Sequence, residues 1–154
     1  MTASSGHMDG GVHIMPIRVY YEDTDAAGMV YHANYLRYAE RARTEMLRLA
    51  GIDHGTLRRD AGIVFTVRNC DIDYTAPARL DDDIEVHTRI LDISGASIRA
   101  EQVVRRDNES LVRLVLRLAC VGENGRPARL PTGLRDALAA LQQTASQQQS
   151  EVRA

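Results

Sequence analysis

The sequence predicts an α+β protein in which one long helix lies against an antiparallel sheet. One stretch early in the chain has helical periodicity, and four later stretches alternate apolar and polar residues. A single helix followed by a run of strands is typical of a sheet that wraps around the helix. The length of 154 residues suits one domain with one core.

The long helix is predicted over residues 32–51, HANYLRYAERARTEMLRLAG. Its apolar residues recur at three- and four-residue spacing and form one face: Tyr35, Ala39, Ala42, Met46 and Leu49. Arg41 and Glu45 are spaced for an i,i+4 ion pair, and Gly51 is a typical helix stop. The alanines on the apolar face allow a sheet to pack closely against it.

The strands are predicted from alternation, in residues 63–76, 84–93, 96–107 and 110–121. A change of phase between Val67 and Cys70 indicates a β-bulge in the first of them. The last stretch also fits helical spacing, but an unbroken period of two over residues 112–120 favours a strand. A short strand over residues 17–21 completes a five-stranded sheet.

The two ends of the chain are expected to lie outside the domain, which we place at residues 16–142. Residues 1–15 are rich in glycine and polar residues without periodicity, and we expect a flexible arm. A short helix is predicted after Pro131, and the glutamine-rich residues 143–154 are expected to be disordered.

Edge-to-edge dimerisation is predicted from the shape of this sheet. One helix covers only one face of five strands, and residues 110–121 are too apolar for a free edge. We therefore expect a homodimer with one continuous sheet.

Composition excludes several classes of protein. A formal net charge of −2 gives no electrostatic reason to bind nucleic acid or an anionic membrane. No apolar run is long enough to span a bilayer and no signal-peptide pattern is visible, so we expect a cytoplasmic protein without membrane insertion. All 19 basic residues are arginine, which excludes Schiff-base and P-loop lysine chemistry. Cys70 and Cys120 lie inside predicted strands, where reduced thiols pack as small apolar groups.

Residues 20–35, YYEDTDAAGMVYHANY, concentrate four of the six tyrosines beside three acids and a histidine. Such a concentration indicates a functional site. The segment begins like a calcium loop. However, its fifth position is Ala27, which has no side-chain oxygen, and its twelfth is Asn34, where a calcium loop needs a bidentate glutamate. A D-x-D motif after a strand also occurs in haloacid-dehalogenase-type phosphatases, but the strand-only second half argues against that fold. A serine hydrolase has no visible nucleophile, because no G-x-S-x-G motif is present.

The run RVYYEDTDAAGMVYHANYLRYAERARTEML resembles the 4-hydroxybenzoyl-CoA thioesterase family of hotdog-fold enzymes, most closely its Tol-Pal-associated acyl-CoA thioesterase (YbgC) branch. The segment DYTAPARLDD at residues 73–82 also resembles that branch, and the likeness extends from about Ile17 to Leu141. The resemblance implies a hotdog fold, a homodimer or homotetramer, acyl-CoA substrates, and neither a metal nor another cofactor.

Site residues follow from this resemblance. It assigns the catalytic aspartate to Asp25, the associated tyrosine and histidine to Tyr21 and His32, and the oxyanion donor to a backbone N–H near His32. Arg68 and Arg79 flank the strand next to residues 73–82, and they are candidates for the CoA phosphates because arginine binds phosphate bidentately.

Thioester hydrolysis needs a group that attacks the carbonyl or activates water, and donors that stabilise the oxyanion. Asp25 could act either as the nucleophile or as the general base, and N–H groups at the start of the helix could donate hydrogen bonds to the oxyanion. The structural alternatives are a turn-forming Asp25, a His32 that acts only through its backbone, and a Tyr21 that is merely a strand residue. We thus expect hydrolysis of acyl-CoA to free acid and CoA. The rival is a hotdog protein that binds acyl-CoA or an acyl carrier protein without hydrolysis.

Overall fold

The computed structural model describes the backbone of residues 4–153 and the side chains of residues 4–142. The strands are β1 (His7–Asp9), β2 (Val12–Arg18), β3 (Ile63–Tyr74), β4 (Asp83–Ile93), β5 (Ser97–Arg106) and β6 (Glu109–Gly122). The helices are α1 (Asn34–Leu49), α2 (His54–Thr56) and α3 (Thr132–Arg153), with a 3₁₀ turn at η1 (Tyr21–Asp23) and a π turn at η2 (Leu57–Ala61). The disorder expected for residues 143–154 concerns residues outside those whose side chains are described, and it stays a prediction.

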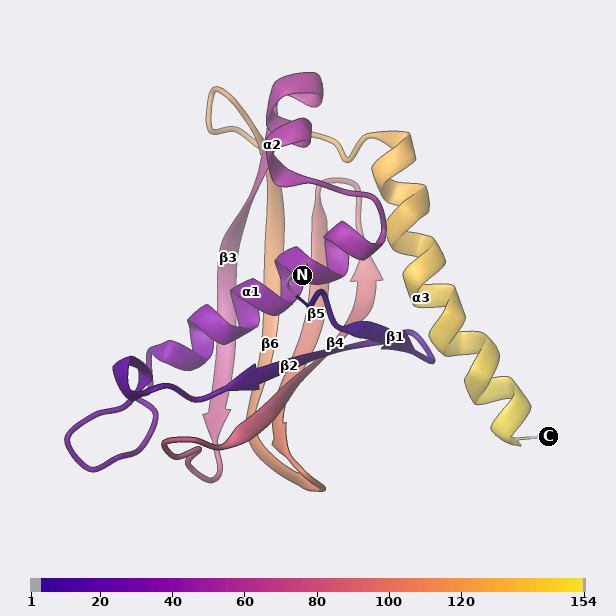
Figure 1. Ribbon diagram of the computed structural model, residues 1–154. Helices are drawn as coiled ribbons and strands as arrows, with labels where there is room; N and C mark the ends of the chain where they lie inside the picture. The colour runs from indigo at the N-terminus through magenta and orange to yellow at the C-terminus, as the bar shows by residue number, and fades with distance from the viewer. Residues whose placement is uncertain (1–3, 154) are drawn as a thin grey trace.

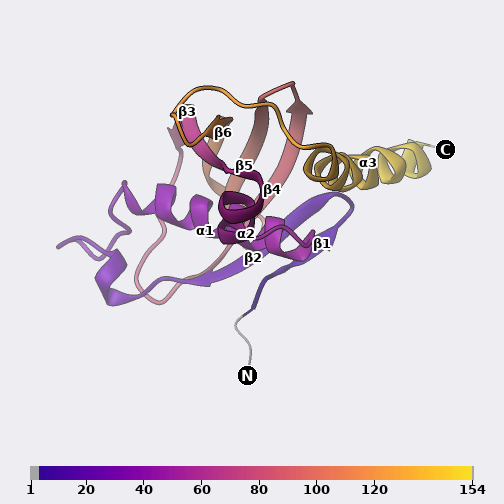
Figure 2. The same ribbon diagram turned by 90° about the horizontal axis from the view of Figure 1, so that it is seen from above.

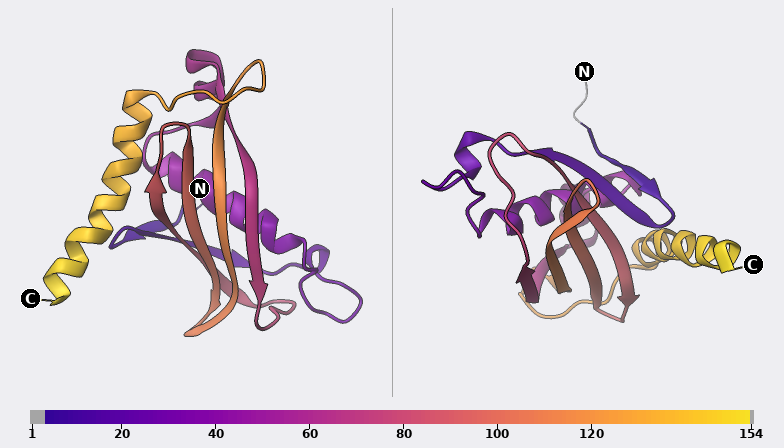
Figure 3. Two further views of the ribbon diagram at one scale, coloured as in Figure 1. Left: turned by 180° about the vertical axis from the view of Figure 1, so that it is seen from behind. Right: turned by 90° about the horizontal axis from the view of Figure 1, so that it is seen from below.

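One antiparallel sheet contains all six strands, in the order β1-β2-β4-β5-β6-β3. The long helix α1 crosses one face of this sheet (Figure 1). Seen from above, the sheet curls so that α1 lies between β1–β2 and β3 (Figure 2). The C-terminal helix α3 lies beside β4, at the side of the molecule away from β3 (Figure 3). The predicted α+β arrangement of a helix wrapped by a sheet is confirmed.

The core has two parts, and each contains one half of α1. Tyr35, Ala39 and Ala42 belong to the first cluster, with residues of β2, β4, β5 and β6. Met46 and Leu47 belong to the second cluster, which also contains Leu134 and Leu138 of α3. The predicted apolar face of the helix is therefore confirmed, except that Leu49 in the last turn is 46% exposed.

The sheet has six strands where five were predicted, because residues 7–18 form a hairpin. Residues 7–15, which were expected to belong to a flexible arm, instead form β1 and the first part of β2. Gly10 and Gly11 both have positive φ, as a two-residue hairpin turn requires. The side chains of His13, Met15 and Ile17 occupy alternate buried positions of β2. The prediction began β2 five residues late, at Ile17, because a histidine at its first buried position hid the alternation, and it missed β1 altogether.

The bulge in β3 is confirmed, since the pairing with β6 shifts register between Val67 and Asn69. Residues 110–121 are a strand as predicted, but β6 lies between β5 and β3. Its apolar character therefore reflects an internal position and is not evidence for a dimer. The long edge strand is β3.

Both cysteines are free thiols in strands, and burial raises the pKa of each. None of the described helices is long and apolar enough to cross a membrane.

Candidate active site

A cavity of about 380 Å³ lies between the start of α1, the segment before it and the loop after β3. Nine residues line it: Asp25, Met29, Val30, His32, Tyr35, Tyr74, Thr75, Ala76 and Pro77. Two of the residues predicted as catalytic, Asp25 and His32, are thus brought together in one place.

Asp25 is held by a tight turn of its own segment. Its Oδ1 accepts hydrogen bonds from the N–H groups of Ala27 (2.9 Å) and Met29 (3.3 Å). Its backbone N–H donates to the Met29 carbonyl at 2.8 Å, and Gly28 closes the turn with a φ of 77°. The other carboxylate oxygen accepts no hydrogen bond within the described part of the chain. The turn therefore orients the carboxylate and leaves one oxygen available.

Two unpaired N–H groups lie immediately before α1, and one of them belongs to His32, which lines the cavity. The N-cap is Ala33, which has no side chain to cap the helix, and Asn34 is the first helical residue. Among the described residues, the N–H groups of His32 and Ala33 donate no hydrogen bond. The first N–H groups of a helix lack partners and carry the positive end of its dipole, so they suit an oxygen that becomes negative.

Tyrosines surround His32 and fix its backbone. The Tyr74 hydroxyl donates to the His32 carbonyl at 3.1 Å, although the two residues are 42 positions apart. The ring of His32 makes edge contacts with Tyr31 and Tyr74 at centroid distances of 4.5 and 6.3 Å. Tyr35 is buried, and its hydroxyl accepts from the N–H of Ala78 at 3.0 Å. Burial raises the pKa of Tyr35, so this hydroxyl remains protonated at neutral pH.

Tyr21 is not brought to the cavity by the fold of one chain. It was expected in a strand but lies in the 3₁₀ turn η1, where 83% of its surface is exposed. It lines a separate surface groove with Tyr20, Glu22, Leu80 and Asp81. The strand ends before Tyr21 because the carboxylate of Asp23 accepts from the Tyr20 N–H and closes a turn.

The two arginines proposed for phosphate are both exposed and line no part of the cavity. Arg68 lies at the bulge of β3. The backbone of Arg79 pairs with Met29, and its N–H donates to Oδ2 of Asp82 at 2.8 Å. Its guanidinium has no ion-pair partner within the described residues. These residues also contain no group of three His, Cys, Asp or Glu side chains arranged to hold a metal ion.

Seven of the nine cavity residues were not predicted as site residues, and two of them are the tyrosines Tyr74 and Tyr35. Tyr74 lies inside the segment DYTAPARLDD, whose resemblance was noted without a role for the tyrosine. Tyr35 was assigned only to the buried face of the helix. Helical spacing identifies buried positions, but it does not show which of them reach a cavity.

Comparison with known proteins decides the family. The sequence profile of the Thioesterase-like superfamily matches residues 19–138, a range that contains every residue of the cavity. The chain belongs to this superfamily. Its relatives place it in the YbgC branch. The acyl-CoA thioesterase YbgC of Haemophilus influenzae is 45% identical over 106 residues, covering 69% of this chain and 78% of the relative. The acyl-CoA thioester hydrolase YbgC of Escherichia coli O6:H1 is 41% identical over 121 residues, covering 77% and 90%.

Solved structures of thioesterases share the fold. A probable thioesterase from Bartonella henselae has a TM-score of 0.74 and 37% identity, covering 78% of this chain and 99% of that one. A thioesterase from Thermus thermophilus, solved in complex with coenzyme A and Zn, has a TM-score of 0.74 and 31% identity, covering 88% and 98%. The predicted hotdog fold is thereby confirmed for this member of the thioesterase superfamily.

Proposed function

We propose that this protein hydrolyses acyl-CoA to a free acid and CoA, and that the reaction takes place at Asp25 beside the start of α1. One observation carries the proposal: Asp25, whose carboxylate has a free oxygen, and His32, which has an unpaired N–H just before α1, line one cavity. Membership of the YbgC branch supports the same activity, because its relatives are acyl-CoA thioesterases.

The helix N–H groups would stabilise the developing negative charge. When a nucleophile adds to the thioester carbon, the carbonyl oxygen becomes an oxyanion. The N–H groups of His32 and Ala33 would bind that oxygen with the help of the helix dipole. The hydrogen bond from Tyr74 to the His32 carbonyl polarises the following peptide bond, which makes the Ala33 N–H a stronger donor.

Two routes are open to Asp25. In the first, its carboxylate oxygen attacks the thioester carbon, CoA thiolate leaves, and water hydrolyses the resulting anhydride. In the second, the carboxylate accepts a proton from a water molecule as that water attacks the carbon. Turnover in ¹⁸O-labelled water tests the first route, because ¹⁸O enters the Asp25 carboxylate only if the anhydride forms and water attacks its aspartyl carbon. The ring of His32 would orient Asp25 or polarise the thioester in either route.

Fewer observations support the roles predicted for Arg79, Arg68 and Tyr21. Arg79 follows the cavity wall at Pro77 by two residues and has a guanidinium without an ion-pair partner within the described residues, which supports contact with a CoA phosphate. Arg68 lies at the bulge of β3 and is not close in sequence to a residue that lines the cavity, so this support is missing for it. For Tyr21, the position outside the cavity of one chain gives no support.

We also propose that the protein forms a homodimer through β3. This strand has twelve residues and is an edge of the sheet, so one side of its backbone has no partner strand in the described chain. Val64, Val67 and Tyr74 are 42%, 50% and 47% exposed along it. A long edge strand with apolar side chains is a template for pairing with a second copy. Tetramer formation, an acyl carrier protein partner, a cytoplasmic location and an association with Tol-Pal stay predictions.

The test is an assay of the purified protein against short, medium, long and aromatic acyl-CoAs with a thiol-trapping reagent. The variant Asp25→Asn is expected to lower kcat on the order of 100-fold or more, the effect of removing a base or nucleophile. Glu22→Gln, which changes an exposed acid three residues away, is the control and should retain activity. Normal turnover by Asp25→Asn would refute the role of Asp25. Tight binding without turnover by the unaltered protein would instead establish the non-hydrolytic alternative.

A further inference from the structure

The wall of the cavity opposite α1 is an irregular loop, residues 75–82, between β3 and β4. Thr75, Ala76 and Pro77 line the cavity directly. Backbone hydrogen bonds to Leu111 and Val19 hold the two ends of this loop, and side chains add further contacts that can fix its geometry beside a substrate. The described contacts show which side chains do so.

The loop is also a backbone partner of the segment that orients Asp25. The N–H of Val30 donates to the Ala78 carbonyl at 2.9 Å, and the N–H of Leu80 donates to the Gly28 carbonyl at 3.1 Å. Met29 lies between Gly28 and Val30, and its backbone N–H and carbonyl both form hydrogen bonds with Asp25. A displacement of residues 78–80 would therefore move residues 28–30 and, with them, the carboxylate of Asp25.

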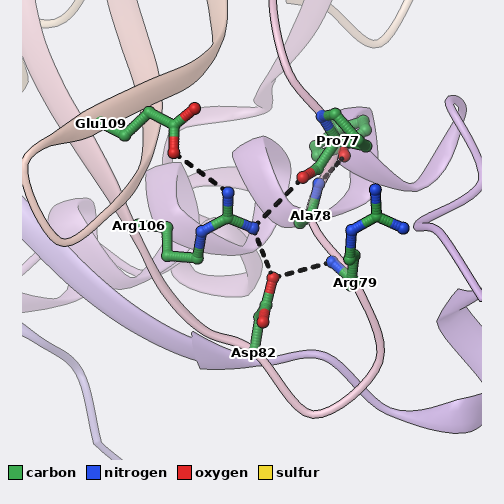
Figure 4. Close-up of polar contacts among 7 residues, drawn as sticks. Pro77, Ala78, Arg79, Asp82, Arg106 and Glu109 are labelled. Carbon is green, nitrogen blue, oxygen red and sulfur yellow. Dashed lines mark hydrogen bonds and ion pairs between the residues drawn. The ribbon is translucent and has the colours of Figure 1, made fainter.

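One guanidinium fixes both ends of this loop (Figure 4). Nη1 of Arg106, the last residue of β5, donates to the Pro77 carbonyl at 3.2 Å and to Oδ2 of Asp82 at 2.7 Å. The same Asp82 oxygen accepts the Arg79 N–H at 2.8 Å. Nη2 of Arg106 donates to Oε2 of Glu109 at 3.0 Å. Arg106 thus connects a regular strand to two residues of the loop, and Asp82 extends the connection to the backbone of Arg79.

Burial indicates that the pair with Asp82 matters more than the pair with Glu109. The side chains of Arg106 and Asp82 are 27% and 23% exposed, whereas that of Glu109 is 54% exposed. Exposed ion pairs are weakened by water and salt, and partly buried pairs are weakened less.

We propose that Arg106 and Asp82 are positioning residues, whose ion pair holds the loop 75–82 and, through Ala78 and Leu80, the turn that orients Asp25. The proposal rests on the proposed thioesterase function. Neither residue lines the cavity, so both act through the loop and not on the substrate. Arg106 is also engaged on three sides and is not free to bind a CoA phosphate.

The experiment compares steady-state kinetics of Arg106→Gln and Asp82→Asn with two matched controls. Glu109→Gln removes the exposed partner of the same guanidinium. Asp83→Asn makes the same chemical change one residue further on, where the carboxylate pairs with Arg18 and is 77% exposed. All variants are assayed at a temperature at which circular dichroism shows them fully folded. Asp82→Asn preserves the size of the side chain and one acceptor oxygen but removes the charge, so it provides the test if Arg106→Gln does not fold.

A shift of a reacting group by about 1 Å can lower a rate on the order of 100-fold, so we expect kcat of Arg106→Gln to fall at least about tenfold. KM should change by less than about threefold, because the apolar cavity residues remain. The double variant should lose no more than the worse single variant, since both changes break one ion pair. The controls should keep the original kcat.

A purely structural role would lower the melting temperature and leave kcat per folded molecule unchanged. A kcat of Asp82→Asn and Arg106→Gln within about twofold of the controls would therefore overturn the proposal. Asp25→Asn, assayed alongside, separates this result from a failure of the proposed function. If Asp25→Asn is inactive while Arg106→Gln is normal, only the positioning role is wrong. If the unaltered protein hydrolyses no acyl-CoA, the thioesterase proposal itself fails, and the positioning proposal with it.

Discussion

A buried side-chain amide on the sheet, that of Gln102, forms a hydrogen bond to the backbone of α1. We predict how much stability the protein loses when this amide is removed. Gln102 of β5 is completely buried. Its Nε2 donates to the Ala39 carbonyl of α1 at 2.8 Å and to Oγ1 of Thr88 at 2.9 Å, and its Oε1 accepts from Arg43 at 2.8 Å. The variant Gln102→Met keeps the length and approximate volume of the side chain but makes none of these hydrogen bonds.

The magnitude follows from the three bonds. A hydrogen bond to a charged group contributes about 1.5–3 kcal/mol, and a neutral one contributes about 0.5–1.5 kcal/mol. One charged and two neutral bonds therefore sum to roughly 2.5–6 kcal/mol of unfolding free energy, and the Ala39 carbonyl and the Thr88 hydroxyl stay buried without their partner.

The assay is urea unfolding followed by circular dichroism, with Arg99→Gln as the control. Arg99 is also on β5, but its ion pair with Asp92 is about half exposed, so its loss should cost about 1 kcal/mol or less. If Gln102→Met loses less than about 1 kcal/mol, the buried amide does not fasten the helix and the reasoning is refuted.

Three further predictions concern separate parts of the molecule. His13 is completely buried and burial lowers its pKa below 6.5, so the folded protein binds this proton less readily than the unfolded chain. Stability should then be full above pH 6.5 and fall as the pH drops below it, and the fall should be smaller in His13→Phe, as measured by urea unfolding at several pH values. Tyr74→Phe removes one neutral hydrogen bond to the His32 carbonyl, so kcat should fall by about two- to tenfold with little change in KM, and an unchanged kcat would exclude a role in positioning the helix start. Val67→Asp places a charge on the exposed edge of β3 and should convert the proposed dimer to a monomer in light scattering, whereas Leu49→Asp, at a similarly exposed leucine of α1, should not.

The parts of the fold that the sequence predicted are those determined by local spacing. The helix follows from three- and four-residue spacing, and four strands follow from alternation. The bulge in β3 was visible as a change of phase near Val67. The hairpin before residue 18 was missed, because its buried positions begin with a histidine and its two-glycine turn was read as part of an arm.

Contacts between distant residues explain what was missed at the site. The sequence placed Asp25 and His32 through their resemblance to a family, and the fold brings both to one cavity. No local pattern relates Tyr74 to His32, or Arg106 to Asp82, because these pairs are 42 and 24 residues apart. Such pairs meet only after the strands have paired, so spacing within a short stretch carries no signal for them.

In the proposed mechanism, backbone N–H groups near the start of α1 stabilise the oxyanion, and no positively charged side chain takes part. No arginine lines the cavity in the described chain, and the guanidinium of Arg106, which bonds to the Pro77 carbonyl of the cavity wall, is occupied by carboxylates and that carbonyl. In the proposed mechanism, backbone dipoles at the start of α1 would therefore balance negative charge beside Asp25, and they are fixed in place before the substrate binds. Their position depends on Gln102 and Tyr35, which hold the helix, and on the loop 75–82, which holds the turn of Asp25. Both halves of the site are thus built on hydrogen bonds to the backbone, and this is why residues outside the cavity are expected to control its rate.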